Sequence, residues 1–96
     1  MISYGRQYLD KLDIKAVQKT LKSNLITQGP KVKEFERILK NKIGSKFCAV
    51  VSSGTAALHL VGLSLGWKKD DIILTTPISF IATSNSVLYS NAIPNF

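Results

Sequence analysis

The feature that most constrains the fold is an apolar run at residues 47–51 that passes directly into a turn of small residues at 52–55 and then into a helical pattern. A buried strand that turns at once into a helix is the first half of a β–α–β unit. The first N–H groups of such a helix have no partner within it, and the helix dipole places partial positive charge there. The turn therefore predicts a site for a phosphate group.

Apolar strands and helical patterns alternate along the second half of the chain. We expect strands at 46–52, 72–76 and 92–96, and helices at 54–65 and 80–89. Continuous apolar strands separated by helices indicate an α/β fold, with a parallel sheet and right-handed crossovers. Ligands in such sheets bind beyond the carboxyl ends of the strands, where both strand-to-helix turns lie.

The first half predicts an extended arm, two helices and a loop. Asp10 is suited to cap one helix, and Pro30 and Gly44 are suited to begin and end the next. We divide the chain into 1–29, comprising arm, helix and loop, and 30–96. The apolar positions expected to face a core are Val32, Phe35, Ile38, Leu39 and Ile43 in one helix, and Leu58, Val61 and Leu65 in another.

Composition limits the classes of partner and location. The net charge of +7 fits either an anionic partner, such as nucleic acid or a nucleotide sugar, or solvated helix faces. The scattered lysines favour solvated faces, and aromatic residues are not interleaved with them, so we expect no nucleic acid partner. No apolar run approaches the ~20 residues that span a membrane, and the N-terminus lacks the order of a signal peptide. Cys48 lacks a disulfide partner and is expected to be buried, and we expect a cytoplasmic protein.

Taken alone, the first turn is only moderately specific. It contains neither the P-loop pattern nor the Gly-x-Gly-x-x-Gly of dinucleotide-binding proteins. The second turn, residues 75–80, brings Phe80 to the same edge of the sheet. Phe80 is either a core residue or a ring on which a planar cofactor stacks, and spacing alone leaves both open.

Taken together, three ordered motifs at 25–36, 51–58 and 76–85 resemble the DegT/StrS family of sugar aminotransferases. The resemblance covers essentially the whole chain. It implies part of the large domain of an aspartate-aminotransferase-like (fold type I) enzyme that uses pyridoxal 5'-phosphate (PLP). It also implies transfer of an amino group from glutamate to the 4-keto group of a nucleotide-linked 6-deoxy sugar, and a homodimer. Within the family, the form of residues 76–80 is most similar to enzymes that aminate C4 of UDP-sugars in the pseudaminic acid pathway.

The resemblance also implies residue roles. By this resemblance, Gly54, Thr55 and Ala56 bind the cofactor phosphate, and Phe80 stacks on the pyridine ring. The residues that match positions contacting the nucleotide sugar are Tyr4, Asn24, Leu25, Ile26 and Thr27. In a dimer these residues can contribute to the partner's site.

The residues that carry the family's chemistry are not found. No lysine lies in the family's Ser-x-x-x-His-x-x-Lys context, so the Schiff-base lysine is absent, and so is the aspartate that protonates the pyridine nitrogen. We assign no catalytic residue and no metal site, and His59 is expected to pack rather than react. We therefore expect the N-terminal part of a longer enzyme, inactive and marginally stable alone. The alternative is a non-catalytic module that binds a phosphate or a nucleotide sugar.

Overall fold

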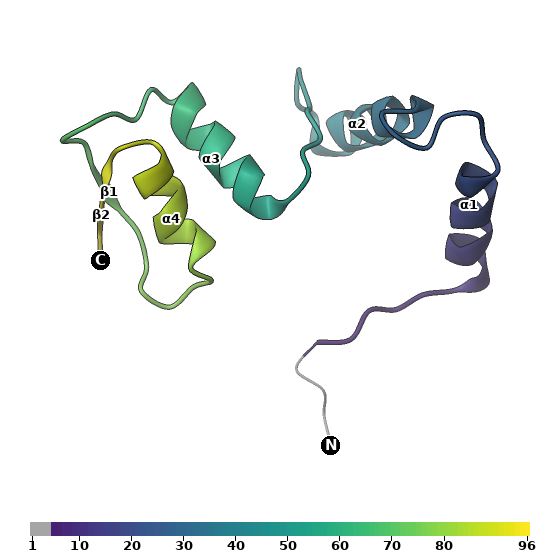
Figure 1. Ribbon diagram of the computed structural model, residues 1–96, viewed down its shortest axis with the longest axis horizontal. Helices are drawn as coiled ribbons and strands as arrows, with labels where there is room; N and C mark the ends of the chain where they lie inside the picture. Colours follow the sequence, from purple (N-terminus) through teal and green to yellow (C-terminus); the bar gives the residue numbers. More distant parts are fainter. Residues whose placement is uncertain (1–4) are drawn as a thin grey trace. The chain divides into compact units, whose positions relative to one another are not determined.

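The computed structural model describes residues 5–96, and the chain divides into two compact units, Met1–Val50 and Val51–Phe96 (Figure 1). The division follows the end of the second helix and the segment after it. This boundary lies later in the chain than the one expected between residues 29 and 30. The expected division, into an arm, helix and loop at 1–29 and a cofactor-binding part at 30–96, remains a prediction.

The first helix of the N-terminal unit, α1 (Lys11–Leu21), begins where the sequence predicts, because Asp10 caps it. Asp10 Oδ1 accepts hydrogen bonds from Leu12 N at 2.7 Å and Asp13 N at 3.0 Å. Asp13 Oδ2 in turn accepts the Asp10 N–H at 2.9 Å. This reciprocal capping box satisfies backbone donors that would otherwise lack partners at the start of a helix.

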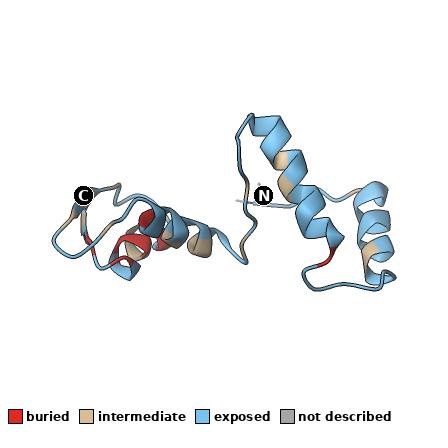
Figure 2. Cartoon of the chain, turned by 90° about the horizontal axis from the view of Figure 1, so that it is seen from above, coloured by how far each residue is buried: buried red, intermediate tan, exposed pale blue. Residues whose placement is uncertain are grey.

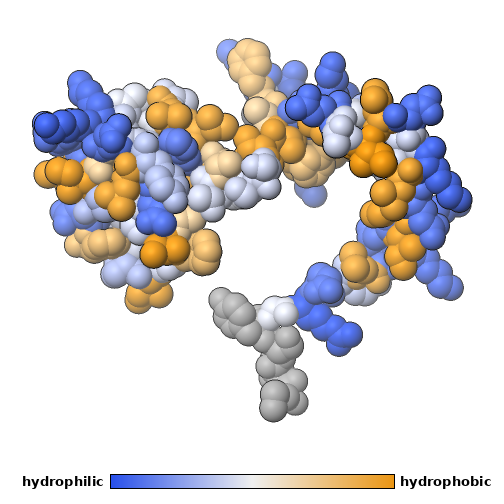
Figure 3. Space-filling model, in the orientation of Figure 1, coloured by the Kyte–Doolittle hydropathy of each residue, from blue (hydrophilic) through white to orange (hydrophobic). Residues whose placement is uncertain are grey.

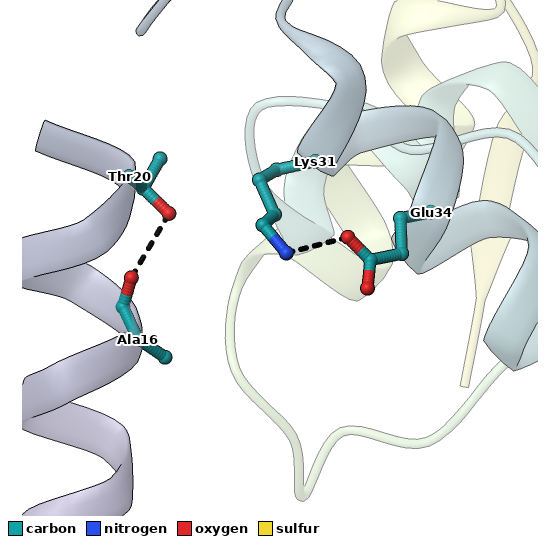
Figure 4. Close-up of polar contacts among 4 residues, drawn as sticks. All are labelled: Ala16, Thr20, Lys31 and Glu34. Carbon is teal, nitrogen blue, oxygen red and sulfur yellow. Dashed lines mark hydrogen bonds and ion pairs between the residues drawn. The ribbon is translucent and has the colours of Figure 1, made fainter. Parts of the chain in front are cut away.

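The second helix, α2 (Pro30–Ile43), has proline at its first position and ends at Gly44, as expected. Gly44 adopts the left-handed conformation, with φ 74°, and its N–H donates to Lys40 O at 2.9 Å. Within the first turns, Lys31 forms an ion pair with Glu34 (Figure 4), with Nζ 2.5 Å from Oε2. The hydrogen bond and the charge of Lys31 lower the pKa of Glu34 below its ordinary value.

Neither α1 nor α2 buries a side chain within the described residues (Figure 2). The apolar stripe expected to face a core along α2 is instead open, and Phe35 is 51% exposed. Figure 3 shows apolar side chains on the surface of both units. Gly29 is the buried position at the start of α2, where a Cβ would lie 2.5 Å from Leu25 O.

The C-terminal unit contains α3 (Gly54–Ser64), β1 (Ile72–Leu74), α4 (Ala82–Tyr89) and β2 (Ile93–Asn95). The two strands pair in parallel, with Ile73 opposite Pro94, and α4 is the crossover between them. This β–α–β unit confirms the α/β class and the parallel strands. The core lies where α4 meets α3 and β2, and its buried residues are Gly62, Ala82, Ser86, Val87, Ser90 and Ala92.

Both helices of this unit end in the same hydrogen-bond pattern, the Schellman motif. At the end of α3, Trp67 N donates to Gly62 O at 3.1 Å, and Gly66, with φ 74°, makes the left-handed step. At the end of α4, Ala92 N donates to Val87 O at 3.1 Å, and Asn91 makes the same step with φ 59°. The motif folds the chain back, so that Trp67 and Ala92 pack on the last turns.

The strand expected at 46–52 is wrong for this structure. The segment has no strand hydrogen bonds, Phe47 is 89% exposed, and Cys48 is half-buried rather than buried. A strand exists only when a neighbour pairs with its backbone groups, and no described strand lies beside this one. Instead, Val50 N donates to Glu36 Oε1 at 3.0 Å, which ties the segment to α2.

The expected inner face of α3 is also wrong. Leu58, Val61 and Leu65 are exposed, whereas Gly62 is buried. The helix is apolar on nearly all sides, so its sequence periodicity does not indicate which face packs within the unit.

Candidate functional site

The turn before α3 leaves backbone donors open at the helix start. Ser53 Oγ accepts the N–H of Ala56 at 3.1 Å, and Ser53 O accepts the N–H of Ala57 at 3.1 Å. Among the described residues, the N–H groups of Gly54 and Thr55 make no hydrogen bond. These two groups sit at the positive end of the helix dipole, which is the arrangement that binds phosphate.

Gly54 keeps the space in front of these donors clear. A Cβ at Gly54 would meet no atom within 4 Å, and its φ is not in the left-handed region. The backbone conformation therefore does not require glycine here. Glycine leaves the space beside the open N–H groups without a side chain.

The second turn presents Phe80, whose side chain is 76% exposed. It borders a cavity of about 280 Å³ together with Thr76, Pro77, Ser79, Ile81, Thr83, Ser84 and Phe96. The turn is fixed by hydroxyl groups: Thr76 Oγ1 accepts the N–H of Ile78 at 3.2 Å, and Ser79 Oγ lies 2.7 Å from Thr83 Oγ1. Phe80 is therefore a surface ring rather than the core residue that spacing also allowed.

Packing brings the two turns to one edge of the unit. α3 and α4 contact each other and begin on the same side of the unit (Figure 1). His59 on α3 meets the ring of Tyr89 on α4 edge-on, with centroids 5.5 Å apart. His59 thus packs, as expected.

The chemistry of the donor set fits the phosphate and ring of pyridoxal phosphate. Neither turn, at residues 51–58 or 75–81, contains a charged side chain. The turn therefore offers two N–H groups and the Thr55 hydroxyl to an anion, and no carboxylate repels it. The exposed Phe80 ring supplies a flat apolar surface of the kind on which an aromatic ring stacks.

The expected substrate residues lie in the other unit. Tyr4 is outside the described residues. Asn24, Leu25, Ile26 and Thr27 form an exposed loop after α1, which begins with Ser23 Oγ donating to Thr20 O at 2.6 Å. The side chains of Leu25 and Ile26 are exposed to solvent in this loop. Their roles stay predictions.

The sequence did not predict the role of Gly62, which lies near the opposite end of α3 from the phosphate turn. Gly62 is buried against Ser90 and Trp67, so that the end of α3 rests directly on the end of α4. A glycine inside a helix costs about 1 kcal/mol relative to alanine. Its presence at this position is therefore the sequence signal of a close contact.

Residues 5–96 contain neither a group of metal ligands nor a helix able to span a membrane. No group of three or more His, Cys, Asp or Glu side chains there is placed to hold a metal ion. No helix in this range has the length and apolar character needed to cross a membrane.

Comparison with known proteins identifies the group to which the chain is similar. It is 47% identical over 92 residues to the UDP-4-amino-4,6-dideoxy-N-acetyl-beta-L-altrosamine transaminase of Campylobacter jejuni subsp. jejuni, covering 96% of this chain and 24% of that protein. The chain thus spans about a quarter of the length of such relatives.

Solved structures give the same result for the fold. Helicobacter pylori PseC, an aminotransferase involved in the biosynthesis of pseudoaminic acid, superposes with a TM-score of 0.89 at 40% identity, over 98% of this chain and 26% of that one. The Streptococcus pneumoniae protein Spr1654, in its PLP-form, superposes with a TM-score of 0.89 at 29% identity, over 98% of this chain and 24% of that one.

The expected partial PLP-transferase fold, and pyridoxal phosphate as the cofactor of the family, are thereby confirmed. The family's sequence pattern matches residues 7–96, nearly the whole chain, and the chain therefore belongs to the DegT/DnrJ/EryC1/StrS aminotransferase family.

Proposed function

We propose that the chain forms the phosphate-binding, N-terminal part of a PLP-dependent aminotransferase that acts on the 4-keto group of a nucleotide-linked 6-deoxy sugar, with glutamate as amino donor. The observation that carries the proposal is the pair of open N–H groups at Gly54 and Thr55. The exposed Phe80 ring supports it, because Phe80 precedes α4, which contacts α3 and begins on the same side (Figure 1). The 47% identity to a UDP-sugar transaminase supports the substrate class.

In this proposal the chain's residues bind and orient the cofactor. The phosphate accepts hydrogen bonds from the N–H groups of Gly54 and Thr55 and from the Thr55 hydroxyl. Ser53 Oγ accepts the N–H of Ala56, and this hydrogen bond fixes the turn. Phe80 holds the plane of the ring. Bound pyridoxal phosphate supplies the electron sink for amino-group transfer. The lysine that would bond to the cofactor covalently is assigned to sequence outside this chain.

The nucleotide sugar is assigned to Tyr4 and to the loop Asn24, Leu25, Ile26 and Thr27. Exposure of Leu25 and Ile26 supports this assignment, because apolar side chains without cover at a loop are suited to contact another molecule. In a homodimer this loop would complete the partner's site.

A chimeric enzyme tests the proposal. Residues 7–96 replace the corresponding segment of the Campylobacter transaminase, and bound cofactor and transamination are measured. We expect an active chimera, and we expect Gly54→Asp to lose the cofactor absorbance and the activity together, because the aspartate fills the clear space and repels phosphate. Leu12→Asp, at a position 75% exposed on α1, is the matched control, because it adds the same charge within the transferred segment but away from the turn.

Two outcomes would decide against the proposal. If Gly54→Asp keeps both cofactor and activity, the turn is not the phosphate site. If the unaltered chimera holds cofactor but cannot transaminate, the non-catalytic binding module is the better description of the chain. Thr27→Ala separately tests the substrate loop, where we expect a higher KM for the nucleotide sugar with unchanged cofactor content.

A further inference from the structure

The contact between the ends of α3 and α4 is unusually close at one position. A Cβ on Gly62 would lie 2.6 Å from Ser90 Oγ and 2.6 Å from Trp67 Cε3, closer than real Cβ atoms approach other atoms. Any side chain at Gly62 therefore forces α4, Trp67 or both to move. The absence of a side chain is what allows this contact.

Both neighbours of Gly62 are held in place by backbone structure. Trp67 is fixed by the Schellman motif, in which its own N–H donates to Gly62 O at 3.1 Å. Ser90 is 3% exposed, and its hydroxyl donates to Ser86 O at 3.1 Å. Neither group is the free end of a flexible side chain, so a methyl group at position 62 is accommodated by a shift of the helices.

The face of α3 that meets α4 also leads to the phosphate turn. Thr55, His59 and Gly62 follow each other at spacings of four and three residues, which places them on one face of the helix. Thr55 and His59 are half-buried and Gly62 is buried. From Gly62 to Thr55 the helix runs roughly 10 Å as a rigid rod, so that a shift at one end moves the other.

We propose that Gly62 is a positioning residue for the cofactor: its contact with Trp67 and Ser90 sets the spacing between the α3 turn that donates to phosphate and the Phe80 ring before α4. The inference rests on the proposed function. Inorganic phosphate needs only the turn at Gly54–Ala56, whereas a pyridoxal derivative needs the turn and the ring at the correct separation. Gly62 thus controls the ratio of the affinity for a pyridoxal derivative to the affinity for inorganic phosphate.

The test compares two ligands on the full chain by amide NMR at Gly54, Thr55 and Ala56. The probes are inorganic phosphate and pyridoxamine phosphate, which lacks the aldehyde that would react with surface lysines. In Gly62→Ala we expect pyridoxamine phosphate affinity to fall about tenfold or more, as for misplacement of ~1 Å, with phosphate affinity changed less than about twofold. Gly5→Ala should change neither.

Two further variants complete the test. Combining Gly62→Ala with Trp67→Leu and Ser90→Ala makes room for the new methyl group, and should restore the preference for pyridoxamine phosphate. If Gly62→Ala does not fold, Trp67→Leu alone removes the contact without adding a clash, and should show the same selective loss.

The outcomes separate the two proposals. If the unaltered chain binds pyridoxamine phosphate at the turn and the variants keep the same ratio of affinities, or lose both ligands equally while folded, the role of Gly62 is overturned and the proposed function stands. If the unaltered chain shows no response at Gly54–Ala56 to either ligand, the proposed function fails and the role of Gly62 fails with it.

Discussion

In the unit Met1–Val50 the helices are held by interactions between near neighbours, whereas in Val51–Phe96 they are held by packing. The capping box of Asp10, the proline at Pro30 and the Lys31–Glu34 pair all act within a turn or two of helix. In the second unit, Val87 on α4 is only 1% exposed. Its helix packs against α3 and β2, which are distant from each other in sequence. Local signals suffice to begin and end a helix, but burial requires a second element.

The comparison also separates the two expected tasks. The loop Asn24–Thr27 assigned to the nucleotide sugar lies in the locally stabilised unit, and the positions assigned to the cofactor lie in the packed unit. A phosphate turn and a stacking ring must keep a fixed separation, which packing provides. The chain spans about a quarter of relatives such as the Campylobacter enzyme, and its exposed apolar stripes are surfaces that further packing would cover.

The largest expected effect comes from a charge placed in the core of the second unit. Val87→Asp buries an unpaired carboxylate at a cost of about 3–5 kcal/mol, comparable to the whole stability of a unit of this size. We expect amide signals of residues 51–96 to collapse while those of α1 and α2 persist. Val17→Asp, at a position 59% exposed on α1, is the matched control and should leave both units intact. Loss of both units in Val87→Asp would show that they do not fold independently.

The next largest effect is expected from replacing two glycines that adopt the left-handed conformation. Gly44 and Gly66 both have φ 74° and space for a Cβ, so alanine should cost about 1–2 kcal/mol at each. Hydrogen exchange should show a loss confined to the end of α2 for Gly44→Ala, and a loss throughout 51–96 for Gly66→Ala, because Gly66 orients Trp67. Asparagine tolerates this conformation and should lessen both effects. Equally local losses would contradict the comparison.

A smaller effect is expected at the capping box. Asp10→Ala removes the acceptor for the Leu12 and Asp13 N–H groups and should destabilise α1 by about 1 kcal/mol. Because α1 buries nothing, the loss should appear as reduced helix content in circular dichroism, with no change in residues 51–96. Asp10→Ser keeps a capping oxygen and serves as control. An unchanged helix signal in Asp10→Ala would mean that packing, not the cap, maintains α1.

The smallest effect concerns pH. The Lys31 hydrogen bond and charge lower the pKa of Glu34 from its ordinary 4.5 in the folded helix. The stabilisation is therefore complete above about 4.5, the unfolded value, and is lost as the pH falls through the lower folded pKa. NMR titration of the Glu34 carboxyl should show a midpoint that returns toward 4.5 in Lys31→Met and at high salt. An identical midpoint in Lys31→Met would remove Lys31 as the cause.

The sequence predicted those parts of the fold that depend on local chemistry. Asp10, Pro30 and Gly44 mark helix ends because their caps, ring and left-handed φ act on the adjacent backbone. The β–α–β unit followed from alternating apolar segments. The strand at 46–52 was wrong because pairing depends on a partner strand, which no local pattern supplies.

For the candidate site, the sequence predicted that the turns at Gly54 and Phe80 lie at one edge because both would follow parallel strands. Only the second turn follows a strand here, and the starts of the two helices share a side through the contact of α3 with α4 (Figure 1). The sequence did not predict Gly62, nor that Leu58, Val61 and Leu65 lie outside the contact with α4. Those features depend on which face of an all-round apolar helix meets its neighbour, and this is decided by close packing against Ser90 and Trp67.

The central claim is that the turn before α3 binds the cofactor through its phosphate. The most direct measurement is an amide NMR titration of the full chain with pyridoxamine phosphate and, separately, with pyridoxamine. We predict saturable shifts at Gly54, Thr55, Ala56 and Phe80 with the phosphorylated ligand, and none there with the other. Equal shifts with both ligands, or shifts confined to the lysines of α1 and α2, would contradict the claim.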